Sequence, residues 1–459
     1  MNTKIALLII ALIALIAISL LLTGCPQHID SQYGVKVTCD GNGNALAVYE
    51  DKLGGSVYIQ KISLEGKPLW RENGIRLCDS DPQFYNYHFI NLVANDSGGA
   101  MITVPAAGYQ YTVFNIDAQG QSRTITGFAD VEQILSDGEG GVILDITQEG
   151  QNTSVVKVDS SGNFPWGVNG ISLPKANEKK IESDGSGGAV ITWLELRYPP
   201  EAKPGEAFST SCIYAQKISS DGLLKWDEGV PIYTSSGTYA ESLQIIGDGT
   251  GGAIIAWHQQ PQGRIEGGSP ESFLMDILVQ KIDSAGNVLW QNGGVPLGIN
   301  KAAEGAFPME PGIVSDGYGG VIVTWRDARQ ETGVYAQRVD ADGNFMWQAG
   351  GIKVATTSLN PHPIIISDGA GGALIAFTND TGLFMQKIDS SGKATWTENG
   401  VQIIKNKFQG YSIVPDRQGG AIIGWGNRGG KAGSEQALVQ RINADGKLLW
   451  GKDGITFNR

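Results

Sequence analysis

A phrase built around a glycine-rich turn recurs eight times after residue 33, and this repetition restricts the fold more than any other feature of the chain. A short apolar run leads into Asp-Gly-x-Gly-Gly, and a second apolar run follows, as in Ser367–Phe377 and Ser183–Trp193. The turn opens at Asp40, Asn95, Asp137, Asp184, Asp248, Asp316, Asp368 and Asp416. A mean spacing of about 54 residues is typical of repeat architectures, so the length of the chain is not evidence for several separate domains.

A second phrase follows each copy of the first: Gln-Lys/Arg-Ile/Val-Asp/Ser/Asn, then a Gly turn, then Trp. Gln280–Trp290 and Gln337–Trp347 are clear copies, whereas the copy at Phe114–Asp117 has lost its Trp. Asp opens such turns by bonding the backbone two residues on, and Gly supplies positive φ without strain. Each phrase therefore predicts a β-hairpin. Two hairpins give four strands in about 50 residues, which is the size of a propeller blade.

The predicted fold is all-β: an eight-bladed β-propeller over residues 34–459, with four antiparallel strands per blade and seven blades as the alternative. Gly is very frequent, at 64 residues, as expected of a chain with many tight turns. The ring is expected to close by packing of the first blade against the last, and exchange of a terminal strand stays open. The second repeat, with its worn motif, is expected to deviate most.

All eleven Trp residues fall at repeat positions. Seven end the second phrase and four end the first: Trp70, Trp166, Trp226, Trp290, Trp347, Trp396 and Trp450, then Trp193, Trp257, Trp325 and Trp425. Because none is left over for a separate ligand site, we expect these rings to pack one blade onto the next.

The segment Asp389–Trp396 resembles the tryptophan-docking repeat of pyrroloquinoline-quinone dehydrogenases, which are eight-bladed propellers. The propeller lipoprotein of the outer-membrane β-barrel assembly machinery shares that repeat. The resemblance extends loosely over all eight repeats and implies the fold more than a function. Asp and Gly are three apart here, against four in the family, and the Asp-Gly-x-Gly-Gly turn is not part of its motif. The adjacent Cys pair of many quinone dehydrogenases is absent, so no quinone cofactor is expected.

The first 24 residues differ from the rest of the chain. Lys4 precedes an apolar run, residues 5–22, that only Ser19 interrupts, and Thr23-Gly24-Cys25 follows. This resembles a bacterial lipoprotein signal, which implies cleavage before Cys25 and attachment of lipid, such as palmitate, to Cys25. Residues 25–33 would then form a lipidated tether. A plain transmembrane anchor is the alternative, because eighteen residues nearly span a bilayer.

Either anchor places the bulk of the chain outside the cytoplasm, on the periplasmic or cell-surface side of a bacterial membrane. The net charge of −13, without Lys/Arg clusters, argues against nucleic acid as a partner. Beyond Cys25 the chain has Cys39, Cys78 and Cys212, and whether Cys39 and Cys78 pair stays open because spacing alone cannot decide it. We expect a monomeric propeller.

Motifs for catalysis, metal ligation and phosphate binding are missing. The four His residues are widely scattered, and the chain has no His-x-x-x-His, Cys-x-x-Cys, Gly-x-Ser-x-Gly or Gly-Lys-Ser/Thr. We therefore expect no catalytic residue, metal or cofactor, and favour a binding or scaffold module for an envelope protein or a glycan. A polysaccharide hydrolase or lyase with a site built from scattered loops, and a purely structural envelope protein, remain alternatives.

The connection between the second and third strands swells in two adjacent repeats. It runs for twenty-one positions from Trp193 to Tyr214 and again from Trp257 to Leu278, against seven from Phe377 to Phe384. We expect exposed loops around residues 198–211 and 259–275, on the face opposite the Asp-Gly-x-Gly-Gly turns, and loops on a rigid scaffold often carry binding residues. The expected contacts are Arg197, Tyr198, His258, Arg264, Arg326 and Arg329.

Overall fold

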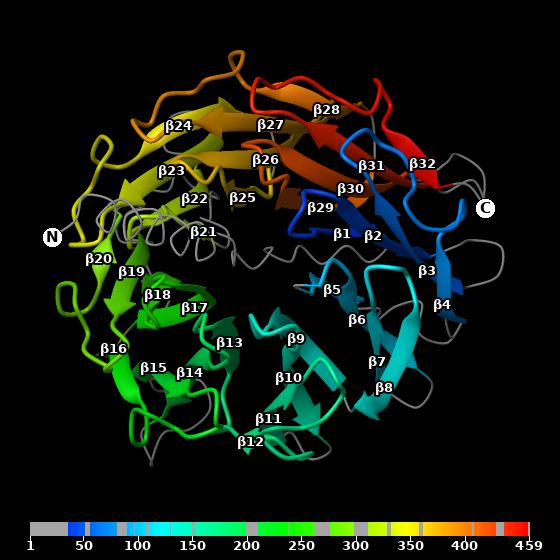
Figure 1. The fold of residues 1–459 in the computed structure, drawn as a ribbon. Coiled ribbons are helices and arrows are strands. Elements are labelled where there is room, and N and C mark those ends of the chain that lie inside the picture. Colours follow the sequence, from blue (N-terminus) through cyan, green and yellow to red (C-terminus); the bar gives the residue numbers. More distant parts are fainter. Residues whose placement is uncertain are drawn as a thin grey trace, which may run out of the picture.

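The computed structural model describes residues 35–457 with gaps at 51–55, 80–89, 96, 107–109, 129, 149–151, 199–209, 237, 262–275, 298–310, 328–331, 358–360, 406–407 and 428–435. Within the described residues, 32 strands form eight four-stranded antiparallel sheets. The sheets follow one another around a ring in chain order (Figure 1). The prediction of an eight-bladed β-propeller is confirmed.

Each blade consists of four strands that are consecutive in the sequence, and its first strand lies innermost in the ring (Figure 1). The first strands are β1 (Lys36–Cys39), β5 (Asn91–Ala94), β9 (Asp130–Ser136), β13 (Glu178–Ser183), β17 (Thr238–Gly247), β21 (Gly312–Ser315), β25 (Ile364–Ser367) and β29 (Gln409–Pro415). The second strands are β2 (Ala45–Glu50), β6 (Ala100–Ala106), β10 (Val142–Gln148), β14 (Ala189–Arg197), β18 (Ala253–Pro261), β22 (Val321–Asp327), β26 (Ala373–Asn379) and β30 (Ala421–Asn427).

In the outer half of each blade, the third strands have seven to nine residues and the fourth strands two to seven. The third strands are β3 (Ser56–Ile62), β7 (Gln110–Ile116), β11 (Asn152–Val158), β15 (Thr210–Ile218), β19 (Asp276–Ile282), β23 (Gly333–Val339), β27 (Gly382–Ile388) and β31 (Gln436–Ile442). The fourth strands are β4 (Ile75–Asp79), β8 (Ser122–Phe128), β12 (Ile171–Ser172), β16 (Val230–Ser236), β20 (Val295–Pro296), β24 (Ile352–Thr356), β28 (Val401–Lys405) and β32 (Ile455–Phe457).

The antiparallel order gives the ring two different faces. The turns between strands one and two and between strands three and four lie at one end of every blade, which we call the hairpin face. The connections between strands two and three, and those that lead to the next blade, lie at the other end, which we call the loop face.

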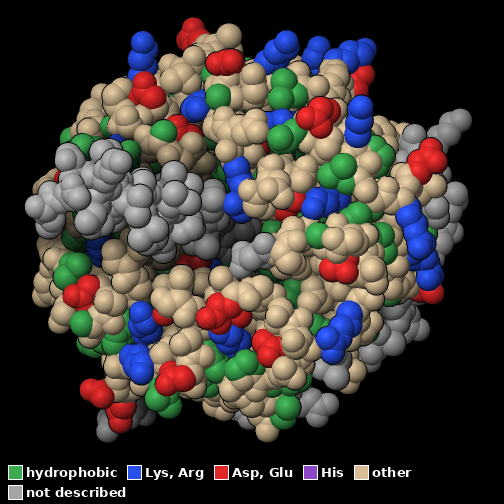
Figure 2. Space-filling view, in the orientation of Figure 1, with side chains coloured by type: hydrophobic (Ala, Val, Ile, Leu, Met, Phe, Trp, Pro, Cys, Tyr) green, Lys and Arg blue, Asp and Glu red, His purple; other side chains and the backbone are tan. Residues whose placement is uncertain are grey.

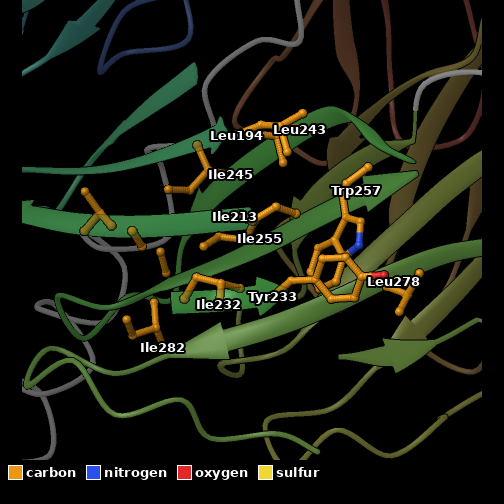
Figure 3. Packing of buried hydrophobic residues seen from close by; sticks show 14 of the residues in the cluster. Leu194, Ile213, Ile232, Tyr233, Leu243, Ile245, Ile255, Trp257, Leu278 and Ile282 are labelled. Carbon is orange, nitrogen blue, oxygen red and sulfur yellow. The ribbon is translucent and has the colours of Figure 1, made fainter. Parts of the chain in front are cut away.

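The core lies in the seams, as we call the interfaces between neighbouring blades. Side chains alternate along a strand, so one set faces the preceding blade and the other set faces the next. In the seam between blades 4 and 5, Leu194 and Ile213 pack with Ile255 and Trp257 (Figure 3). Because both sides of each sheet are buried in this way, the strands read as continuous apolar runs rather than as alternating ones.

The ring closes by packing of blade 1 on blade 8, as expected. Within the described residues, no strand is exchanged between these two blades. Strand β1 lies beside β29 and β30 of blade 8, as Figure 1 shows. Ser412 Oγ donates to the Val35 carbonyl (2.8 Å) and accepts from the Val37 N–H (3.1 Å). Blade 2 has all four strands, but only five residues separate its third strand from its fourth, against eleven or twelve in the other blades, so its expected deviation lies in this connection.

Candidate functional site

On the hairpin face, the repeated charged residues join one blade to the next. The turn Asp of a blade pairs with the Lys or Arg of its own third strand, as in Asp40–Lys61 (2.7 Å), Asp137–Lys157 (3.5 Å), Asp184–Lys217 (3.3 Å), Asp316–Arg338 (2.9 Å), Asp368–Lys387 (3.8 Å) and Asp416–Arg441 (2.9 Å). The same cation then donates to a turn carbonyl of the following blade: Lys61 Nζ reaches the Gly98 carbonyl (2.6 Å), and Arg441 Nη1 the Leu64 carbonyl (3.1 Å) across the closure. The charges and hydrogen-bonding groups of these side chains are therefore used to join the blades.

The repeated Trp residues also serve the seams. Each Trp at the end of the second phrase donates its indole N–H to a carbonyl in the outer turn of the next blade, as in Trp290 to Ala341 (2.9 Å) and Trp450 to Leu64 (3.1 Å). In the turn that receives it, a Cβ at Gly343 would lie 3.0 Å from the Trp290 ring. The expectation that these rings pack blade on blade is confirmed.

In blade 2, neutral side chains replace the ion pair of the hairpin face. Asn95 occupies the position of the turn Asp and Asn115 the position of the Lys, and Asn95 Nδ2 donates to Asn115 Oδ1 (3.3 Å). Asn115 Nδ2 still donates to the next blade, at the Ser160 carbonyl (3.1 Å). At the position of the missing Trp, Ile125 lies against the Gly162 turn.

On the loop face, blades 4 and 5 differ from the others. Strands β14, β15 and β18 have nine residues and β17 has ten, against seven or fewer in the second and third strands of the remaining blades. The two sequence insertions thus begin as paired strand: Arg197 pairs with Thr210, and Gln259 with Asp276. Part of each expected loop is therefore strand, because the added residues continue an existing ladder, and the rest of both insertions lies outside the described residues.

The edge of blade 4 carries a bound arginine beside aromatic rings. Glu195 accepts the Trp193 indole N–H (3.0 Å) and bonds Arg197 through Nε (3.1 Å) and Nη2 (2.9 Å). The Arg197 guanidinium lies over the Tyr214 ring, 5.3 Å from its centroid. Tyr198 follows with 59% of its surface exposed. This edge therefore offers hydrogen-bond donors and acceptors beside an aromatic face. The Arg197–Glu195 pair carries no net charge.

The edge of blade 5 carries a histidine–glutamate pair. His258 Nδ1 lies 3.1 Å from Glu241 Oε1, which also accepts from Gln260 Nε2 (3.1 Å). The ladder slips by a bulge after Glu241, where Ser242 has φ +59°, and this irregularity positions the carboxylate. Burial lowers the pKa of His258, although Glu241 acts in the opposite sense. His258 Nε2 is buried and has no hydrogen-bond partner within the described part of the chain.

A second network on blade 5 faces blade 4. Tyr233 Oη is bonded to Gln259 Oε1 (2.9 Å) and lies 3.0 Å from Thr238 Oγ1. The Tyr233 ring packs on Trp257 with a centroid separation of 5.1 Å, and both rings appear in Figure 3. These contacts hold the extended strands β17 and β18 in place at the rim.

The seam between blades 3 and 4 holds a charged cluster that no other blade repeats among the residues the structure describes. Lys179 Nζ of β13 lies 3.1 Å from Asp145 Oδ1 and 3.3 Å from Glu132 Oε1, both of blade 3. Asp145 is fully buried, and burial raises the pKa of its carboxyl to about 6 although Lys179 lowers it. The Asp145 position holds Thr, Ala, Val or Gly in the other blades, so the cluster is not required by the repeat.

Buried polar atoms without a hydrogen-bond partner gather toward the loop face. Among the described residues they belong to Asn91, Thr103, Asp145, Thr153, Trp257, His258 and Arg326. Each lies at the middle of its strand or on the loop-face side of it. Asp145 is nevertheless ion-paired with Lys179, and Thr103 and Trp257 lie at mid-strand, so the unpartnered atoms nearest the loop face belong to Asn91, Thr153, His258 and Arg326.

The residues expected at the rim reach the loop face in different seams. Arg197 faces blade 3 with Tyr214, His258 faces blade 6 with Ile277, and Arg326 faces blade 7 with Val334. They are therefore spread along the rim over three seams and do not line one pocket. Arg264, Arg329 and Cys25 lie outside the described residues. Sequence reasoning missed Lys179, Asp145 and Glu241, of which only Asp145 stood out in the sequence, as a charged residue where all other repeats are uncharged.

Other expected features can be placed briefly. Cys39, Cys78 and Cys212 are free thiols, so Cys39 and Cys78 do not pair. No group of three or more potential metal ligands occurs in the described part of the chain. Nor does any helix there have the length and apolarity to cross a membrane. On the face shown in Figure 2, Lys and Arg side chains are interspersed with Asp and Glu.

Neither a protein-family model nor a curated protein matches the chain. Solved structures resemble it only distantly. A puromycin hydrolase shares 14% identity with a TM-score of 0.43, over 88% of this chain and 61% of its own. A putative 6-phosphogluconolactonase from Bacteroides uniformis shares 12% with a TM-score of 0.39, over 77% and 94%. The prolyl oligopeptidase B of Galerina marginata shares 10% with a TM-score of 0.42, over 94% and 58%.

The chain spans about three fifths of the puromycin hydrolase and of the oligopeptidase. These similarities are propeller similarities, and at such identities they say nothing about activity.

Proposed function

We propose that this protein is an extracytoplasmic, lipid-anchored propeller that binds a glycan or an envelope protein at the loop face of blades 4 and 5. The observation that carries the proposal is the contrast between the two faces. The repeated polar residues of the hairpin face are used to join blades, whereas the loop face of blades 4 and 5 adds polar and aromatic residues that the repeat does not need.

The chemistry of these edges favours a ligand with many hydroxyl or amide groups. Arg197–Glu195 and His258–Glu241–Gln260 combine donors and acceptors at the ends of strands, and Tyr198 adds an exposed ring. Hydrogen-bonding groups beside aromatic faces on a rigid scaffold are a common basis for recognition of such ligands.

A glycan array and a pull-down from envelope extract test the proposal, with trimmed loops as the decisive variant. Residues 198–209 are replaced by the two-residue turn Asp380-Thr381, which closes the Asn379–Gly382 pair in blade 7 as it would close Arg197–Thr210. Residues 262–275 are shortened to four. Binding should be lost while the melting temperature stays nearly unchanged, since loop length has little effect on stability.

Capture that survives the double trim would move the site to the central channel or the hairpin face. Release of product from a polysaccharide would instead favour the alternative, a hydrolase or lyase with a site built from scattered loops. Absence of any defined ligand would favour a purely structural envelope protein.

The anchor is tested separately by Cys25→Ser. The sulfur of Cys25 is the proposed acyl acceptor, so this variant should take up no labelled palmitate and should leave the membrane fraction. Val35 precedes β1 at the loop face, so a tether over residues 25–33 would turn that face toward the membrane. Palmitate uptake by the variant, or none by the wild type, would contradict the anchor.

A further inference from the structure

Exposed apolar side chains gather on one part of the outer rim, away from the site proposed above. Nine of the eleven exposed large apolar side chains in the described residues lie on the segments between strands three and four. Six of them lie on the outer hairpins of three consecutive blades, and we call them the apolar arc: Leu223 (57% exposed), Leu224 (48%), Val288 (37%), Leu289 (48%), Phe345 (38%) and Met346 (50%). The pairs in blades 5 and 6 occupy equivalent positions, and the pair in blade 4 lies one residue earlier.

The docking Trp residues link the three hairpins that carry the arc. Trp226, just after Leu224 and Lys225, donates to the Ser284 carbonyl (3.3 Å) in the turn that precedes Val288. Trp290, directly after Leu289, donates in the same way to Ala341 (2.9 Å), ahead of Phe345. Three neighbouring hairpins are thereby held against one another, and apolar side chains gathered on adjoining elements mark an interaction site more often than scattered single residues do.

The fold does not require these exposed side chains. In blade 7, Ala394 and Thr395 stand at the positions of Val288 and Leu289, yet Trp396 still donates to the Ala444 carbonyl (2.9 Å) of blade 8. Docking of the Trp is therefore independent of a large apolar pair before it, and the pairs in blades 4 to 6 need another explanation.

The segments that carry the apolar arc are acidic, which favours a partner with basic residues. Residues 219–229, 283–294 and 340–351 contain six acidic side chains and one basic one, Lys225. The equivalent segments of blades 7, 8 and 1, residues 389–400, 443–454 and 63–74, contain six acidic and five basic ones. Hydrogen bonds from Ser219 and Asn287 lower the pKa values of Asp221 and Asp283, so both carboxylates stay ionised at neutral pH.

We propose that the apolar arc is a docking surface for a basic, apolar segment of a partner protein. Such a segment covers the exposed side chains and neutralises the acidic rim, whereas a second copy of this chain or an anionic lipid surface would bring like charges together. This inference concerns a different surface from the proposed loop-face site and stands without it.

The test uses the triple variant Leu224→Ser, Leu289→Ser and Met346→Ser, which changes only exposed residues. The control is Leu69→Ser with Leu449→Ser, which are exposed and lie in blades 1 and 8 at the positions equivalent to Leu289 and Met346. Fluorescence anisotropy measures binding of a synthetic amphipathic Lys/Leu peptide and of a Glu/Leu peptide with the same pattern. The wild type and the control should bind the Lys/Leu peptide at least tenfold more tightly than the triple variant, more weakly as salt rises, and should not bind the Glu/Leu peptide.

Equal binding of the Lys/Leu peptide by the triple variant, or none by the wild type, would overturn the proposal. Sedimentation of the wild type as a dimer that the triple variant abolishes would assign the arc to self-association instead. Binding to anionic vesicles that the same variant abolishes would assign it to lipid. Melting curves of all three proteins confirm that the substitutions leave the fold intact.

Discussion

Single residues in this ring are held by what faces them across a seam. Glu182 shows this most clearly: its carboxyl lies two residues before a turn Asp, where Val, Leu or Ile stands in six of the other blades and Thr38 in the seventh. It is almost fully buried and accepts a bond from the Ser183 N–H (3.0 Å). Burial raises its pKa from 4.5 to about 8, although that bond lowers it, so the group is protonated in the folded protein at neutral pH.

This burial predicts a pH dependence of stability with a definite sign. Below about pH 4.5 the carboxyl is protonated in both states and has no effect on the free energy of unfolding. As the pH rises toward 8, only the unfolded chain loses the proton, so stability falls. Glu182→Gln should lessen the fall between pH 5 and 8, measured by urea denaturation. The exposed control Glu398→Gln should follow the wild type, and an unchanged profile for Glu182→Gln would show that the carboxyl is ionised when folded.

At the scale of elements, the hairpins are joined by buried ion pairs that also bond the next blade. Asp40 and Lys61 are both buried, so removing one partner leaves a charge without compensation. Blade 2 demonstrates a neutral version with Asn95 and Asn115. The pair therefore determines how two blades meet, but its charge is not essential to a blade of this shape.

A double-mutant cycle tests this interpretation. Asp40→Asn alone and Lys61→Asn alone should each cost about 3–5 kcal/mol, the usual cost of a buried charge left unpaired. The double variant should cost clearly less than the sum, because it recreates the Asn–Asn contact of blade 2. Urea denaturation of the four proteins gives the coupling energy, and additive costs would refute the interpretation.

At the scale of the whole molecule, the interface between blades 8 and 1 that closes the ring is built like the seams between consecutive blades. The contacts of Trp450 and Arg441 with Leu64 repeat those between consecutive blades, and no exchanged strand joins the ends. Phe457 ends β32 and Val35 precedes β1, both at the loop face, where Lys405 ends β28 and Gln409 begins β29 elsewhere in the ring.

A circular permutant should therefore fold. Joining residue 457 to residue 35 through a three-residue linker, and opening the chain between Lys405 and Phe408, moves the break from one seam to another. Its melting temperature should stay within a few degrees of that of the chain from residue 35 onward. A much less stable or open ring would show that the seam between blades 8 and 1 is not equivalent to the others.

The sequence by itself determined the number of blades, the four hairpin-joined strands in each and the role of the Trp residues. Hairpins depend on contacts within about ten residues, so the spacing of Asp, Gly and Trp predicts them directly. Only the tertiary structure decided how polar residues meet across seams. Lys179 and Asp145 are far apart in the chain, and neighbours such as Trp257 and His258 turn to opposite blades because side chains alternate along a strand. Which residues come together at the rim therefore depends on strand register and on ring closure. Neither can be predicted from the spacing of residues within one repeat.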